Sequence, residues 1–151
     1  MGIHFTSLLP TKYRHDLESL LFFNTNQGSV SPGIVDSINK YGVPRIVVDG
    51  DVLRLAVGNM HSVQTLYALA ERGEYPELAG AIIYTRIDME TIVLLHMTVK
   101  DEYSFNGSNS HEMLAMKSFE RLRAIARQIK GVRSLLIMYG DGSEETIEAT
   151  N

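Results

Sequence analysis

The most constraining feature of the sequence is a pair of long apolar segments, residues 78–87 and 91–99, separated by Asp88-Met-Glu90. Their lengths and the short polar connection predict a β-hairpin. The second segment contains four consecutive aliphatic residues, from Ile92 to Leu95. Such a run is typical of a central strand whose two faces are both covered. We therefore expect a layered domain built around this hairpin.

The composition is that of a single globular domain over residues 1–151, with 44% hydrophobic and 21% charged residues. The absence of cysteine excludes disulfides, thiolate nucleophiles and cysteine-ligated zinc. A net charge of -4 argues against a generally nucleic-acid-binding surface. No apolar run approaches the roughly 20 residues that cross a bilayer, and the N-terminus lacks the pattern of a secretory signal. We expect a soluble, cytoplasmic protein with neither a nucleic-acid nor a membrane partner.

Local patterns predict the remaining elements. Apolar residues at helical spacing indicate helices, β-branched or alternating segments indicate strands, and Asp49-Gly50 supplies the turn of a further β-hairpin. The expected helices are residues 11–23, 31–42 and 111–130, the expected strands are 45–48, 52–57 and 132–139, and residues 62–70 are either a strand or a short helix. The acidic residues after 140 are typical of a frayed tail. The expected fold class is α/β (α+β), with a mixed, mostly antiparallel central sheet flanked by helices.

The loop between strand 91–99 and the long helix reads Lys-Asp-Glu-Tyr-Ser-Phe-Asn-Gly-Ser-Asn-Ser over residues 100–110. With its flanking elements, it resembles the GNAT superfamily of acyl-CoA N-acyltransferases. Val99 matches the family's strand end, Tyr103 its tyrosine and Gly107 its first loop glycine. The sequence departs from the family pattern at Ser104, where Arg or Gln is usual, and at Asn109, where a second small residue is usual.

The resemblance implies a GNAT-like fold. It also implies that the protein uses acetyl-CoA or another acyl-CoA as co-substrate and a small-molecule or peptide amine as acceptor. Backbone amides at a helix N-terminus bind phosphate through unpaired donors and the helix dipole, and glycine permits close approach. The implied CoA-binding residues are Met97, Thr98 and Val99 on the strand and Gly107, Ser108, Asn109 and Ser110 in the loop, where the last three can also cap the helix. Basic residues on helix 111–130 either face an adenosine 3'-phosphate or form an ordinary solvated surface.

Three residues are candidates for proton transfer. His96 is the titratable side chain of the central strand and can accept a proton from the amine, directly or through water. It can equally be a hydrogen-bonded structural histidine. Glu90 in the hairpin turn is a second candidate base. Tyr139 is a candidate proton donor to the leaving thiolate, although the family tyrosine with that role lies in a later helix.

The family continues with another helix and two strands, so we expect a C-terminally shortened version here. An open sheet edge near the C-terminus would favour pairing into a homodimer. The five histidines are scattered, without the spacing of a metal site, and we expect no metal. The alternative to an N-acetyltransferase is a non-catalytic member of the same fold, which acts as a ligand sensor or a dimeric interaction module.

Overall fold

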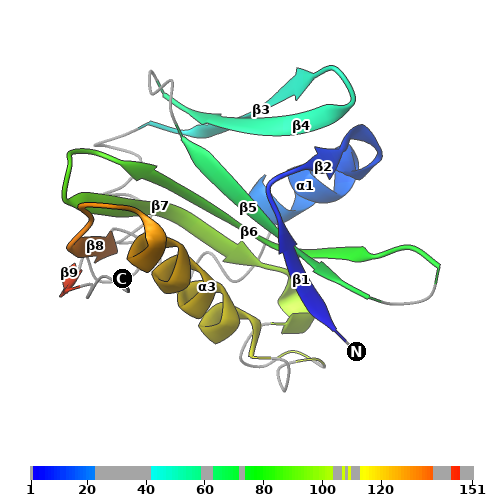
Figure 1. Ribbon diagram of the computed structural model, residues 1–151. Helices are drawn as coiled ribbons and strands as arrows, with labels where there is room; N and C mark the ends of the chain where they lie inside the picture. Colours follow the sequence, from blue (N-terminus) through cyan, green and yellow to red (C-terminus); the bar gives the residue numbers. More distant parts are fainter. Residues whose placement is uncertain are drawn as a thin grey trace.

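The computed structural model describes residues 2–22, 42–58, 63–71, 74–103, 107, 109, 113–137 and 144–146. These residues form a large sheet with the strand order β1-β5-β6-β7-β8-β9, a small sheet and two α-helices (Figure 1). The large sheet consists of β1 (Ile3–Thr6), β5 (Gln64–Ala70), β6 (Glu77–Arg86), β7 (Thr91–Val99), β8 (Ser134–Ile137) and β9 (Glu144–Thr146). The helices are α1 (Arg14–Phe22) and α3 (Leu114–Gln128), preceded by the 3-10 turns η1 (Thr11–Tyr13) and η3 (Asp101–Tyr103).

The large sheet is mixed. The strand pairs β1–β5, β5–β6, β6–β7 and β8–β9 are antiparallel, whereas β7 and β8 are parallel. Parallel neighbours need a crossover connection, and here α3 carries the chain from the end of β7 to the start of β8. The expected α+β class with a mixed, mostly antiparallel sheet is confirmed.

The two helices lie on opposite faces of the large sheet (Figure 1). The central strand β7 demonstrates this, because its side chains alternate between two apolar clusters. Leu95 packs in one cluster with Leu17 of α1, and Leu94 packs in the other with Leu122 of α3. Residues 92–98 are all buried. The strand that the aliphatic run predicts is therefore covered on both faces.

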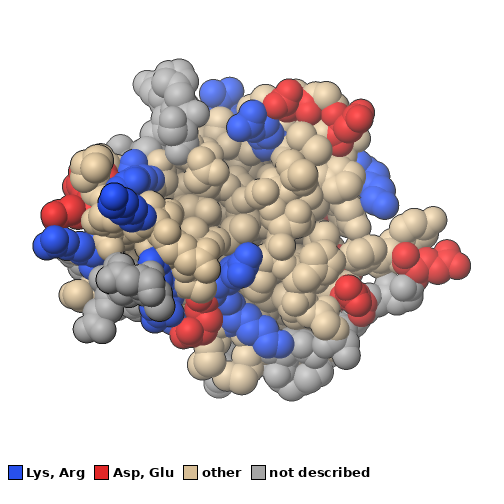
Figure 2. Space-filling view, in the orientation of Figure 1, with Lys and Arg blue, Asp and Glu red and all other residues tan. Residues whose placement is uncertain are grey.

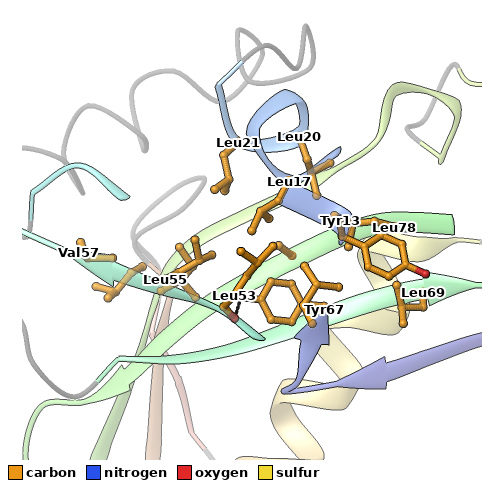
Figure 3. Packing of buried hydrophobic residues seen from close by; sticks show 14 of the residues in the cluster. Tyr13, Leu17, Leu20, Leu21, Leu53, Leu55, Val57, Tyr67, Leu69 and Leu78 are labelled. Carbon is orange, nitrogen blue, oxygen red and sulfur yellow. Dashed lines mark hydrogen bonds between the residues drawn. The ribbon is translucent and has the colours of Figure 1, made fainter. Parts of the chain in front are cut away.

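The small sheet lies on the same side of the large sheet as α1. It has the order β2-β4-β3, with β2 at Leu9–Pro10, β4 at Val52–Val57 and β3 at Pro44–Asp49. The hairpin around Asp49-Gly50 is thus confirmed, and Gly50 has the positive φ of 61° that such a turn requires. Apolar side chains of α1, β4 and the large sheet form one core (Figure 3). Within it, the Tyr67 hydroxyl donates a 3.3 Å hydrogen bond to the Leu53 carbonyl oxygen and joins the two sheets.

Some sequence-based expectations are confirmed and others are wrong. The hairpin of β6 and β7 and the first helix are confirmed, and residues 62–70 contain a strand, β5. The long helix begins at Leu114, later than expected, with Met113 as its N-cap. The acidic tail is not wholly frayed, because β9 pairs antiparallel with β8. The helix expected over 31–42 lies outside the described residues except for Gly42 at its end.

Candidate functional site

The segment that resembles an acyl-CoA site follows β7, passes through η3 and a loop, and continues into α3. The parallel ladder between β7 and β8 runs from Thr91 opposite Ser134 to Leu94 opposite Ile137. Residues 138–143, which directly follow β8, lie outside the described residues. The candidate CoA-binding stretch of residues 97–99 therefore comes after the part of β7 that this ladder covers.

A β-bulge in β7 decides which face of the sheet His96 occupies. Ile83 of β6 pairs with His96, whereas the next residue, Tyr84, pairs with Leu94. Leu95 is therefore an extra residue, and the alternation of side chains is interrupted there. Because Ile83 belongs to the core on the α1 side, its partner His96 lies on that side as well.

Beyond the bulge, the side chains of β7 alternate again. Thr98 lies on the α1 side, where its Oγ1 donates a hydrogen bond to the Leu20 carbonyl oxygen at 3.1 Å. Met97 packs on the opposite side against Leu122 of α3. Both side chains are buried, so they anchor the strand between the two helices. Any contact of this stretch with a co-substrate would be made mainly by backbone atoms.

His96 is buried, with 7% of its surface exposed. Burial disfavours the charged imidazolium and lowers the pKa of His96 from 6.5 to about 4. The ring is therefore neutral at physiological pH. A neutral imidazole with so low a pKa accepts and donates hydrogen bonds, but it is a weak general base.

Two of the three proton-transfer candidates, His96 and Glu90, are described, and they lie far apart. Glu90 precedes the start of β7, and its exposed carboxylate lies 3.9 Å from the Arg133 guanidinium. Its backbone oxygen accepts hydrogen bonds from the amides of Arg133 and Ser134. At about 3.3 Å per strand residue, Glu90 is roughly 20 Å from His96. At this separation, Glu90 and His96 cannot act together as one acid–base pair. Tyr139 lies outside the described residues.

Two of the four loop candidates, Gly107 and Asn109, are described, and both lie against η3. A Cβ atom at Gly107 would come within 2.3 Å of the carbonyl oxygens of Asp101 and Glu102. The Asn109 amide donates a 2.7 Å hydrogen bond to the Glu102 carbonyl oxygen. The Asn109 side chain is buried, and its Nδ2 has no hydrogen-bond partner in the described structure. The glycine therefore has a packing role, and Ser108 and Ser110 lie outside the described residues.

The N-terminus of α3 differs from the sequence-based expectation. Its N-cap is Met113, which has a left-handed backbone with φ of 52°, and no side chain caps the helix. The expected cap by Asn109 or its neighbouring serines is therefore wrong, because the helix begins later in the chain. The first turn contains no acidic residue. Basic side chains gather over α3 and around its C-terminal end (Figure 2). The N-terminal end of α3, which is the positive end of the helix dipole and carries no acidic side chain in its first turn, is electrostatically suited to an anion.

Charged residues that directly follow β7 form a network that the sequence did not reveal. The Lys100 ammonium forms ion pairs with Glu77 and, at 3.5 Å, with Glu102. The buried Tyr103 donates from its hydroxyl to the other Glu77 carboxylate oxygen, 3.2 Å away. The tyrosine of the family-like pattern thus anchors η3 to the start of β6. In the sequence, only the charged residues 100–102 indicated this network. Glu77, the ion-pair partner of Lys100, is distant in sequence.

A hollow of about 270 Å³ lies beside this network, between α1 and the end of β7. Its lining residues are Asp16, Ser19, Leu20, Leu78, Lys100, Asp101 and Glu102. They come from α1, β6 and the segment after β7, so no short sequence motif could have indicated them. The hollow combines apolar and negatively charged walls at the end of the central strand.

Within the described residues, no group of three or more His, Asp or Glu side chains is placed to hold a metal ion. No helix of the described part is long and apolar enough to cross a membrane. No family model, curated protein or solved structure matches this chain. A functional interpretation therefore depends on the geometry of the chain itself.

Proposed function

We propose that this protein binds an acyl-CoA along β7 and the N-terminal end of α3 and transfers the acyl group to an amine. The main support is the connection of β7 through a loop and α3 to the parallel strand β8. This is the element order that the GNAT-like segment implies. In this proposal, the pantetheine arm contacts backbone atoms of the stretch from Met97 to Val99. The pyrophosphate binds at the loop and the first turn of α3.

The electrostatics of α3 support binding of an anionic co-substrate. The free amides at the start of a helix and its dipole favour phosphate, and no acidic side chain occupies the first turn. Lys117 lies in that turn, because its amide donates a 3.0 Å hydrogen bond to the Met113 carbonyl oxygen. An ammonium group at this position would contribute further to phosphate binding.

In the proposed reaction, the neutral amine nitrogen attacks the thioester carbonyl carbon, and the backbone at Met97 or Thr98 polarises the carbonyl. The tetrahedral intermediate collapses with cleavage of the carbon–sulfur bond. The amine loses one proton and the CoA thiolate takes up one proton, so the products are an amide and free CoA. His96 remains our candidate for the first proton acceptor, and Tyr139 remains the candidate donor to the thiolate.

Two observations favour a non-catalytic binding module of the same fold as the second candidate. The pKa of His96 is lowered to about 4, which weakens it as a base. Glu90 is too far along the hairpin to assist it. Such a protein would bind the acyl-CoA, or another ligand at the same place, without turnover. Pairing of two copies through the C-terminal sheet edge also remains a prediction, which light scattering in solution would test.

Calorimetric titration with acetyl-CoA tests the proposal. We expect saturable binding in the micromolar range. The affinity for acetyl-CoA should fall about fivefold in the Lys117→Met variant, as for the loss of an exposed charge pair. Lys12→Met is the matched control, because Lys12 belongs to η1, where its ammonium lies over the rings of Tyr13 and Tyr75. Absence of binding at millimolar acetyl-CoA would refute the acyl-CoA site. Binding without acyl transfer to any amine in a broad acceptor panel would favour the non-catalytic module.

A further inference from the structure

We propose that the acceptor amine carries a second, non-reacting ammonium group, and that this group binds in the hollow between α1 and η3. This inference rests on the proposed function and adds the class of the acceptor, a diamine with a short apolar spacer. It is based on the shape of the hollow, the charge of its walls and its connection to β7.

The hollow has apolar and polar parts that match such a molecule. Leu20 and Leu78 are buried side chains that contribute its apolar wall. The polar wall consists of the Ser19 hydroxyl, three carboxylates and Lys100. Its volume of about 270 Å³ is sufficient for one small organic molecule. An alkyl spacer would pack on the leucines, while an ammonium group would contact the carboxylates.

The charge of the walls favours a cation. Lys100 is the basic residue of the lining, and its charge is already compensated by Glu77 and Glu102. Asp16 adds a further negative charge to the lining. Asp16 forms no ion pair within the described part of the chain. A ligand ammonium would therefore be attracted to Asp16 without displacing an existing partner.

The hollow is directly connected to the strand that would carry the thioester. Leu20, which lines it, accepts the hydrogen bond from Thr98 Oγ1 at 3.1 Å. Lys100, which also lines it, immediately follows β7. Carboxylates stabilise the protonated form of an amine, whereas the attacking nitrogen must be neutral. For this reason we place the non-reacting ammonium in the hollow and the reacting nitrogen nearer to His96.

Equilibrium binding of two probes tests this inference. The probes are 1,4-diaminobutane and butylamine, each titrated by ligand-detected NMR into the full chain saturated with free CoA, which has no acyl group to transfer. We expect the diamine to bind about fivefold or more tightly than the monoamine, and Asp16→Asn to abolish the difference. Glu18→Gln is the matched control, because Glu18 is on the same helix but pairs with Arg14 at 3.1 Å and does not line the hollow.

The outcomes separate this inference from the proposed function. Equal binding of the two probes, or unchanged diamine binding in a folded Asp16→Asn variant, would overturn the diamine proposal while leaving acyl-CoA binding intact. Absence of acetyl-CoA binding would refute the proposed function, and the hollow would then not be an acceptor site even if the diamine bound there. Mono-acetylated 1,4-diaminobutane, detected by mass spectrometry and strongly reduced in Asp16→Asn, would support both.

Discussion

Acidification should destabilise this protein through His96, and the size of the effect follows from its burial. In the folded chain the pKa of His96 is lowered from 6.5 to about 4. At pH values between 4 and 6.5, His96 binds a proton in the unfolded state but not in the folded state. The free energy of unfolding therefore falls as the pH decreases from above 6.5 to below 4. With 1.36 kcal/mol per pKa unit, the full loss from this residue is roughly 3 kcal/mol.

Urea unfolding of the wild type and His96→Leu, followed by circular dichroism at pH 7, 5.5 and 4.5, measures this effect. Carboxylates contribute to acid sensitivity in both proteins, so the difference between the two proteins isolates His96. We expect the free energy of unfolding to fall more steeply with acid in the wild type than in the variant. Parallel pH profiles would show that His96 titrates near its ordinary pKa, and the account of a neutral, weakly basic residue would be wrong.

Three further predictions concern packing. Gly107→Ala should cost about 1–3 kcal/mol in urea unfolding without any ligand, because its Cβ would meet two η3 carbonyl oxygens at 2.3 Å. Gly2→Ala, with no atom within 4 Å of its Cβ, is the control, and equal stabilities would refute the contact. Leu122→Ala should cost about 2–5 kcal/mol in the same assay, since Leu122 is fully buried, and a loss below about 1 kcal/mol would contradict this packing. Tyr67→Phe should cost about 1 kcal/mol by removing the hydrogen bond to Leu53, and an unchanged midpoint would argue against that bond.

The first of these packing predictions changes how the loop can be tested. A bulky residue at Gly107 would reduce CoA binding even if the loop never touched phosphate, because it would disturb η3. Loss of binding in such a variant is therefore not proof of a phosphate site. Lys117 is the better position for this test, because its substitution removes a charge from the surface of α3 without introducing a steric clash.

The sequence predicts the hairpins well because each depends on local information. Asp49-Gly50 favours one turn geometry, and the two apolar segments of β6 and β7 are joined by three residues. The strands β1 and β2 escaped prediction, because two or four residues carry too little periodicity to be recognised. Their pairing with β5 and β4 is a long-range effect. The same holds for β9, whose acidic sequence gives no indication of a strand.

The candidate site was predictable only in part. His96 was identified from its position in an apolar strand, but its side of the sheet depends on the bulge at Leu95, which has no sequence signature. The extended loop pattern suggested a helix cap at Asn109, yet that residue is buried against η3. The hollow combines Asp16 with residues after β7, and only the packing of α1 on the sheet brings them together.

The central claim is that an acyl-CoA binds along β7 and the start of α3. Backbone amide NMR, with acetyl-CoA titrated into the labelled protein, tests it most directly. We predict that the largest shift changes occur at Met97, Thr98 and Val99 and in the first turn of α3, with little change in the small sheet of β2, β3 and β4. No shift changes at millimolar acetyl-CoA, or changes confined to that small sheet, would contradict the claim.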